Sequence, residues 1–247
     1  MAVYERDGAF LYYEEHGAGF PLLLIAPGGM NSTVDFWARM PINPVEIFPS
    51  EFRVIAMDQR NAGRSSGPLP IEDPWGTYVA DQLGLLDHLG IDRFLVIGCC
   101  IGCSYILKQI EAAPERVVGG VMMQPIGKNE TNPGVFGERI YREWGDGLRA
   151  KRSDISAEDI EKFGQAMWSD DFVISVPTSF ISTVQTPLLV LPGNDPAHPI
   201  GVGREVARLL PNAEIFDRAW KDPEVVPETV ERMWTFLRAH TPSLETA

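Results

Sequence analysis

The chain has 247 residues, with 34 acidic against 21 basic side chains and a net charge of −13. It is long enough for one α/β domain with an insertion, and because it has no basic run, nucleic acid and anionic membranes are not its expected partners. No apolar run approaches membrane-spanning length, and the first residues lack the apolar core of a signal peptide. Three cysteines inside five positions make no disulfide framework. We therefore expect a cytoplasmic protein with a small-molecule substrate and with neither cofactor nor metal.

The first part of the chain predicts buried strands joined by glycine-containing loops. The aromatic stretch 10–17 and the fully apolar stretch from residue 21 predict a hairpin that enters a buried sheet. After the second strand, Gly28 and Gly29 permit close approach of the backbone to a neighbouring site. A further strand is expected at 52–57, followed by the polar loop 58–65 and by a helix at 78–89.

An apolar strand then leads into a two-glycine turn with Cys100 at its apex. Gly98 and Gly102 lack the side chains that would collide when a strand and a helix come this close. Such a turn places a nucleophile at the carboxyl end of a strand and at the amino end of a helix. There the N–H of Ile101 can hold an oxyanion, and the helix dipole favours the thiolate. The alternative is that these are merely small residues at a junction, as we expect for Cys99 and Cys103.

The second half resumes the alternation of strands and helices after one interruption. The segment 127–183 is rich in charge and tryptophan and offers no clear buried strand, so it predicts a small helical cap inserted between core segments 1–126 and 184–247. The pattern predicts an α/β fold with a mostly parallel central sheet flanked by helices. The expected strands are 117–123, 187–192 and 213–216, and the expected helices are 137–148, 157–168, 202–210 and 228–240.

The loop after strand 187–192 carries an acid and a base, Asp195 and His198. Its prolines and glycine forbid regular structure. His198 is the one histidine of the four that we expect in a loop at the carboxyl end of a strand, where active sites of parallel sheets lie. We therefore predict that His198 is the base. Aromatic side chains of the cap, Trp144 and Trp168 among them, indicate an apolar or aromatic pocket for substrate, although they could equally cover the core.

Four motifs, in the right order, resemble those of the α/β-hydrolase family over nearly the whole chain. They are Pro27-Gly28-Gly29, the loop Asp58 to Ser65, Gly98-Cys99-Cys100-Ile101-Gly102, and Gly193-Asn194-Asp195 followed by Pro199. The resemblance implies Cys100 as nucleophile at a nucleophile elbow, Asp195 as the triad acid, and an oxyanion hole from Ile101, Gly29 and Met30. Cysteine in place of serine is similar to dienelactone-hydrolase-like members. The implied activity is hydrolysis of a small carboxylic ester, a lactone or a thioester.

The chain departs from this family where the catalytic histidine is expected. That histidine normally follows the last strand, and here Trp220 occupies its register, so His198 is an unusual base and Trp220 is taken as a substrate contact. One alternative is therefore a ligand-binding or non-hydrolytic protein that keeps the fold. Another is a thiol redox protein that uses the C-x-x-C pair Cys100 and Cys103. Ester turnover with an acyl adduct on Cys100 distinguishes the hydrolase from both.

Overall fold

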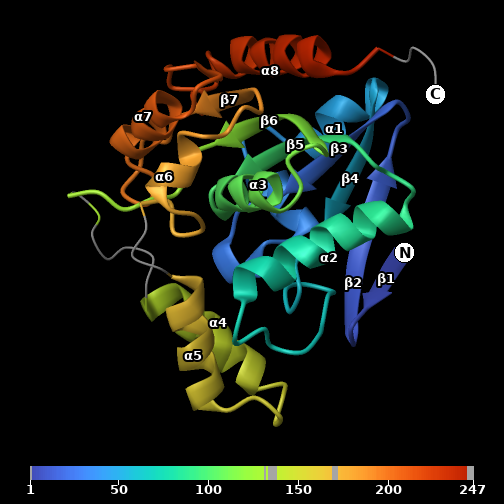
Figure 1. Cartoon of the computed structure of the whole chain (residues 1–247), viewed down its shortest axis with the longest axis vertical. Helices are drawn as coiled ribbons and strands as arrows, with labels where there is room; N and C mark the ends of the chain where they lie inside the picture. Colours follow the sequence, from blue (N-terminus) through green and yellow to red (C-terminus); the bar gives the residue numbers. More distant parts are fainter. Residues whose placement is uncertain (1, 131, 133–137, 169–171, 244–247) are drawn as a thin grey trace.

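The computed structural model describes residues 2–130, 132, 138–168 and 172–243 (Figure 1). In these residues eight strands form one sheet in the order β1-β2-β4-β3-β5-β6-β7-β8. The strands are β1 Ala2–Arg6, β2 Ala9–His16, β3 Phe20–Ile25, β4 Phe52–Met57, β5 Phe94–Cys99, β6 Val117–Met123, β7 Leu188–Leu191 and β8 Ala213–Ile215. The helices are α1 Pro44–Ile47, α2 Pro74–His88, α3 Ile101–Ala112, α4 Glu138–Arg149, α5 Ala157–Met167, α6 Thr178–Ile181, α7 Ile200–Leu209 and α8 Val226–His240, with 3-10 turns η1 Gly29–Asn31, η2 Val34–Arg39 and η3 Phe48–Ser50.

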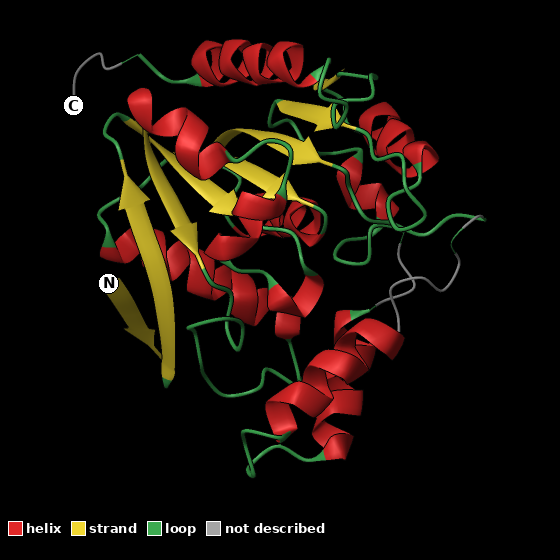
Figure 2. Cartoon of the chain, turned by 180° about the vertical axis from the view of Figure 1, so that it is seen from behind, coloured by secondary structure: helices red, strands yellow, loops and turns green. Residues whose placement is uncertain are grey.

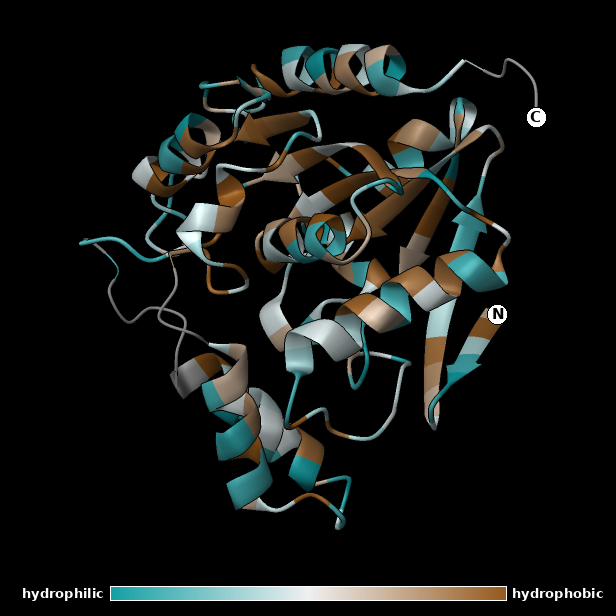
Figure 3. Cartoon of the chain, viewed as in Figure 1, coloured by the Kyte–Doolittle hydropathy of each residue, from teal (hydrophilic) through white to brown (hydrophobic). Residues whose placement is uncertain are grey.

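Strands β3 to β8 run parallel, and helices cover both faces of the sheet (Figure 2). Along β3, Leu23 and Ile25 join the apolar core that includes α2 and α3, whereas Leu22 and Leu24 join the core that includes α8. A strand buried on both faces needs apolar residues at every position, which is why the central strands are continuous hydrophobic runs (Figure 3). The predicted α/β fold with a mostly parallel sheet is confirmed.

The predicted hairpin between 10–17 and the strand from residue 21 is wrong. Strand β2 pairs antiparallel with β1 and β4, and β3 lies between β4 and β5 in parallel pairing. The hairpin is instead β1 to β2, through Asp7 and Gly8 at φ 46° and 73°. An apolar β3 must be covered on both faces, and helices provide that cover at the centre of the sheet.

The loop after β4 is held by hydrogen bonds and ion pairs of charged side chains, of which Asp58, Arg60 and Asp81 are buried. Asp58 accepts hydrogen bonds from the N–H of Val34 at 2.8 Å and from Arg64 Nε at 2.8 Å. Arg60 forms a two-pronged ion pair with Asp81 of α2, with oxygen–nitrogen distances of 2.7 and 2.6 Å. The side chains of Arg60 and Asp81 are 4% and 1% exposed, so the loop is fixed to α2 inside the protein.

Substitution Asp81→Ala is expected to destabilise the protein by about 3–5 kcal/mol, because it leaves the Arg60 guanidinium buried without its counter-charge. Urea unfolding followed by circular dichroism measures the change. Glu158→Ala removes the exposed partner of Lys162 and serves as the control with little expected effect. Equal midpoints for the two variants would show that the Arg60–Asp81 pair does not hold the loop.

Helices α4 and α5 pack against each other at the lower end of the view in Figure 1. The rings of Trp144 and Phe163 pack against each other with centroids 5.1 Å apart, and a side chain at Gly164 would meet the ring of Tyr141. Ser156 precedes α5 and caps it, because its side chain accepts from the N–H of Asp159 in a capping box. Both helices lie where the sequence predicts them, within 127–183, and the division of the chain into core and cap stays a prediction. None of the described helices combines the length and apolarity needed to cross a bilayer.

Candidate active site

Cys100 lies between the last residue of β5 and the first residue of α3. Its backbone has φ 58° and ψ −116°, a conformation that L-residues rarely adopt. A Cβ at Gly98 would lie 2.4 Å from the carbonyl oxygen of Gly102, and a Cβ at Gly102 would lie 2.5 Å from that of Ile25. The two glycines are therefore required by close backbone approach, as the sequence predicts.

The Cys100 thiol is half-buried and lies beside two backbone donors, the N–H groups of Ile101 and Gly28. Burial raises the pKa of the thiol to about 12, and these two N–H groups oppose the rise without cancelling it. The N–H groups at the helix start favour the thiolate, in the direction that the sequence predicts, but burial has the larger effect on the pKa. The sulfur carries its proton at neutral pH, and it needs a base when it attacks.

Asp195 and His198 come together in the loop that follows β7. Asp195 Oδ1 lies 2.8 Å from His198 Nδ1 and accepts from the N–H of Ala197 at 3.0 Å and of His198 at 2.9 Å. Its other oxygen, Oδ2, accepts from Lys221 Nζ at 2.6 Å. Because β5 and β7 are parallel, this loop and the Cys100 turn lie at the same edge of the sheet.

The charges in this loop set the protonation states of both partners. Burial alone would raise the pKa of Asp195, but Lys221 and His198 hold it at about 2. Burial lowers the pKa of His198, against the opposing pull of Asp195. At neutral pH the pair is therefore a carboxylate and a neutral imidazole. An ionised carboxylate only accepts hydrogen bonds, so Nδ1 carries the imidazole proton and Nε2 keeps the lone pair of a base.

The other two cysteines are buried away from solvent. Cys103 Sγ donates to the carbonyl oxygens of Gly98 and Met123, each at 3.3 Å. Burial raises the pKa of Cys99 and of Cys103 well above the usual range for a thiol. Within the described ranges, no group of three or more His, Cys, Asp or Glu side chains is arranged to hold a metal ion.

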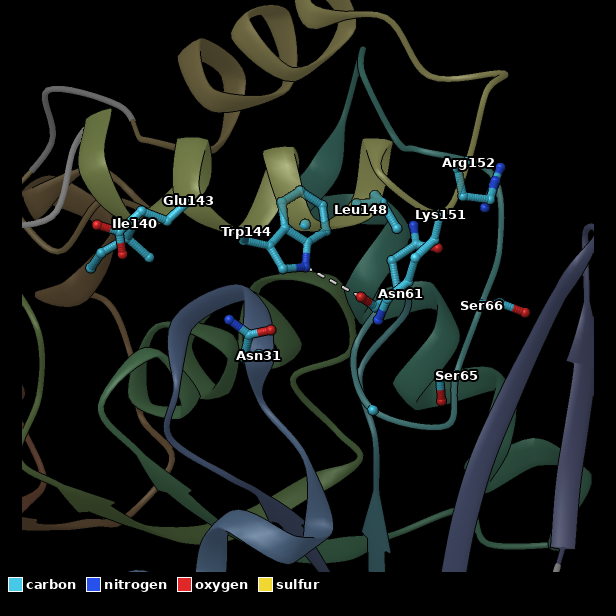
Figure 4. Close-up of a pocket in the computed structure, with 12 residues that line it drawn as sticks. Asn31, Asn61, Ser65, Ser66, Ile140, Glu143, Trp144, Leu148, Lys151 and Arg152 are labelled. Atoms are coloured by element: carbon cyan, nitrogen blue, oxygen red, sulfur yellow. Dashed lines mark hydrogen bonds between the residues drawn. The ribbon is translucent and has the colours of Figure 1, made fainter.

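The three tryptophans predicted to contact substrate lie in different surroundings. Trp220 is 1% exposed and lies in the core that includes α8. Its Nε1 donates to the carbonyl of Pro192 at 2.8 Å. Trp168 is half-buried directly after α5. Trp144 is a buried residue of α4, and its Nε1 donates to the carbonyl of Asn61 at 3.2 Å (Figure 4). Their contact with substrate stays a prediction.

Sequence reasoning names Gly28 only as a point of close backbone approach, and it does not name Lys221. The prediction names Gly29 and Met30 for the oxyanion hole; both lie in η1, and the N–H beside the thiol belongs to Gly28, one residue earlier. Gly28 has φ 117°, a conformation that favours glycine. The double glycine is the feature of the sequence that indicates this turn. Lys221 directly follows Trp220, which stands where the family's histidine is expected. That position is the feature of the sequence that points to Lys221.

The chain belongs to the alpha/beta hydrolase fold family, whose pattern matches residues 21–145. It is 34% identical over 119 residues to a zearalenone hydrolase of Cladophialophora bantiana, covering 47% of this chain and 43% of that protein. It is 37% identical over 112 residues to a putative carbamate hydrolase, RutD, of Azorhizobium caulinodans, covering 44% and 38%. The matches thus span less than half the length of these relatives.

Two solved structures show the same fold over nearly the whole chain. One is Est816, described as an N-acyl homoserine lactone degrading enzyme, with a TM-score of 0.68, 21% identity, and coverage of 95% of this chain and 100% of that one. The other is the enol-lactonase of Burkholderia xenovorans LB400, with a TM-score of 0.70, 19% identity, and coverage of 96% and 100%. At this level of identity the likeness concerns the fold.

Proposed function

We propose that the protein is a hydrolase of a small carboxylic ester, lactone or thioester, working by acyl transfer to Cys100 with His198 as the base. The observation that carries the proposal is the pairing of two features at one edge of the sheet. One is a strained Cys100 with two N–H donors at its sulfur, and the other is the Asp195–His198 hydrogen bond. Relatives and neighbours named as hydrolases and lactonases support the same class of reaction.

In the proposed first half-reaction, the Cys100 sulfur attacks the substrate carbonyl as His198 Nε2 accepts the thiol proton. The N–H groups of Ile101 and Gly28 stabilise the oxyanion, and the imidazolium then protonates the leaving alcohol. In the second half-reaction His198 Nε2 takes a proton from the water that attacks the thioester carbonyl. The C–S bond then breaks, the acid is released, and the imidazolium returns its proton to the Cys100 sulfur. Asp195 keeps the imidazole oriented and stabilises its positive charge, and Lys221 holds Asp195 in place.

The ligand-binding alternative is supported by Trp220, which fills the register of the family's histidine and is fixed by its bond to Pro192. The redox alternative has less support. Disulfide exchange proceeds through a thiolate, and burial raises the pKa of both Cys100 and Cys103. A panel of chromogenic esters and lactones, assayed together with a thiol–disulfide exchange substrate, separates these classes. The absence of ester and lactone turnover across the panel would favour the binding protein.

The proposed base predicts the pH dependence of turnover. Because burial lowers the pKa of His198, kcat/KM is expected to rise with pH, reach half its maximum below pH 6.5, and stay level from pH 7 to 9. The thiol, with its pKa raised to about 12, adds no second rise in that range. Initial rates across pH 4.5–9.5 at constant ionic strength measure the profile. A rise in kcat/KM through pH 8–9 would indicate a preformed thiolate and contradict the proposed role of His198.

A further inference from the structure

Lys221 lies in the loop between β8 and α8, where the family's histidine is expected. Its neighbour Trp220 fixes this loop, since the buried indole donates to the carbonyl of Pro192 at 2.8 Å. Pro192 directly follows β7 and opens the loop that carries Asp195 and His198. Lys221 Nζ lies 5.5 Å from the centre of the Trp220 ring, a distance at which the ring attracts a cation. The lysine is thus held beside the proposed acid and base.

The two carboxylate oxygens of Asp195 have different partners. Oδ1 accepts hydrogen bonds within its own loop, from the N–H groups of Ala197 and His198 and from His198 Nδ1. Oδ2 accepts from Lys221 Nζ at 2.6 Å. Because donors of the loop itself already fix Oδ1, the main contribution of Lys221 is a positive charge beside the negative charge of the carboxylate.

The charges around His198 oppose each other. Burial has the largest effect on the pKa of His198, which it lowers; among the described residues, Asp195 raises that pKa and Lys221 lowers it. The Cys100 turn at the same edge of the sheet adds a thiol that is protonated at neutral pH. The balance between one carboxylate and one ammonium group therefore decides how readily the imidazole takes a proton from solvent.

We propose that Lys221 is a positioning residue that acts on His198 through Asp195, sharing the carboxylate charge so that the imidazole stays neutral and able to accept a proton. Without Lys221, the full charge of Asp195 would act on the ring, which would then bind a solvent proton and lose its lone pair at a higher pH. The inference rests on the proposed function for the use of that lone pair, whereas the protonation of the ring is measurable without turnover.

The titration of His198 tests the inference directly, in a Cys100→Ala protein that forms no acyl adduct. NMR of protein labelled with ¹³C at histidine Cε1 follows each of the four rings, and the signal lost in His198→Ala identifies His198. In Lys221→Met the midpoint for His198 is expected to rise by about 0.5–1 pH unit, because a like charge near the ring is removed and the charge of Asp195 is no longer shared. An unchanged or lower midpoint would overturn the inference.

Two further variants at the same position separate charge from hydrogen bonding. Lys221→Gln keeps a donor for Oδ2 without the charge, so it should raise the midpoint as Lys221→Met does. Lys221→Arg keeps both and should restore the wild-type midpoint. The matched control is Arg218→Met, which removes a cation of the same loop that pairs with Glu228 and should leave the midpoint unchanged. A wild-type midpoint in Lys221→Gln would show that the hydrogen bond matters and the charge does not, against the proposal.

The route through Asp195 is tested in an Asp195→Asn background. There Lys221→Met should move the midpoint less than it does in the presence of Asp195, because the carboxylate whose charge the lysine shares is gone. An equal shift in both backgrounds would mean that Lys221 acts on the ring directly, and it would contradict the proposed route.

Turnover separates this inference from the proposed function. With 4-nitrophenyl esters, Lys221→Met should lower kcat/KM by a factor of about 3 to 10 at the low-pH end of the profile and change it little on the plateau, as the expected shift of the midpoint requires. A lysine with only a structural role would lower kcat/KM equally at every pH. Turnover with an unshifted titration would overturn the role of Lys221 and leave the hydrolase intact. A shifted titration without any turnover would support that role and contradict the hydrolase.

Discussion

Substitution Cys100→Ala is expected to lower kcat/KM for activated esters by at least about 10³-fold, because it removes the atom that forms the covalent intermediate. Cys100→Ser is expected to keep part of the activity, since the neutral thiol and a hydroxyl both need His198 to take their proton. Steady-state assays with 4-nitrophenyl esters measure both variants.

The matched control for Cys100→Ala is Cys103→Ser, which changes a cysteine three residues away, in the first turn of α3. Cys103 Sγ donates to two backbone carbonyls, and a hydroxyl can make the same bonds, so activity should be largely retained. Limited alkylation with peptide mapping should label Cys100 before Cys99 and Cys103, because Cys100 is half-buried and the other two are buried. Loss of activity in Cys103→Ser with retention in Cys100→Ala would reverse the assignment of the nucleophile.

The second large effect is expected from His198→Ala, which should slow acylation and deacylation each by about 10²–10⁴-fold. The sequence alone predicts a larger effect on deacylation, since it assumes a preformed thiolate. The raised pKa of Cys100 changes that expectation, because the base must now take a proton in both steps. Single-turnover kinetics with a chromogenic ester resolves the two rates.

Two further variants test how His198 acts. Asp195→Asn should produce a smaller loss, because the amide oxygen can still accept from Nδ1 but no longer carries the negative charge that stabilises the imidazolium. His88→Ala is the control, since His88 is exposed at the end of α2 and stacks on Tyr4. Wild-type rates of both steps in His198→Ala would remove this histidine from the mechanism.

The sequence predicts the central strands and the Cys100 turn well because their signals are local. Strand β5 and the glycines at 98 and 102 are encoded in a continuous apolar run and a fixed spacing. Strand β1 has alternating burial and only five residues, and the aromatic β2 was paired with the wrong neighbour. Pairing depends on which position in the sheet lets helices cover both faces of β3, and this is a property of the whole fold.

The site is predicted less completely because its chemistry depends on burial and on contacts between distant segments. The order of motifs points to Cys100, Asp195 and His198, but neither the contact of Asp195 with Lys221 nor the raised pKa of the thiol follows from spacing.

Intact-protein mass spectrometry of an acid-quenched reaction tests the central claim most directly. During turnover of a slowly hydrolysed ester, the wild-type protein should gain the mass of one acyl group, and peptide mapping should locate it on the peptide that holds Cys100. The adduct should be absent in Cys100→Ala and should form more slowly in His198→Ala. Acyl transfer to Cys100 would be contradicted if the ester were hydrolysed and neither the wild-type protein nor His198→Ala gained the acyl mass. An acyl group found on another residue would contradict it as well.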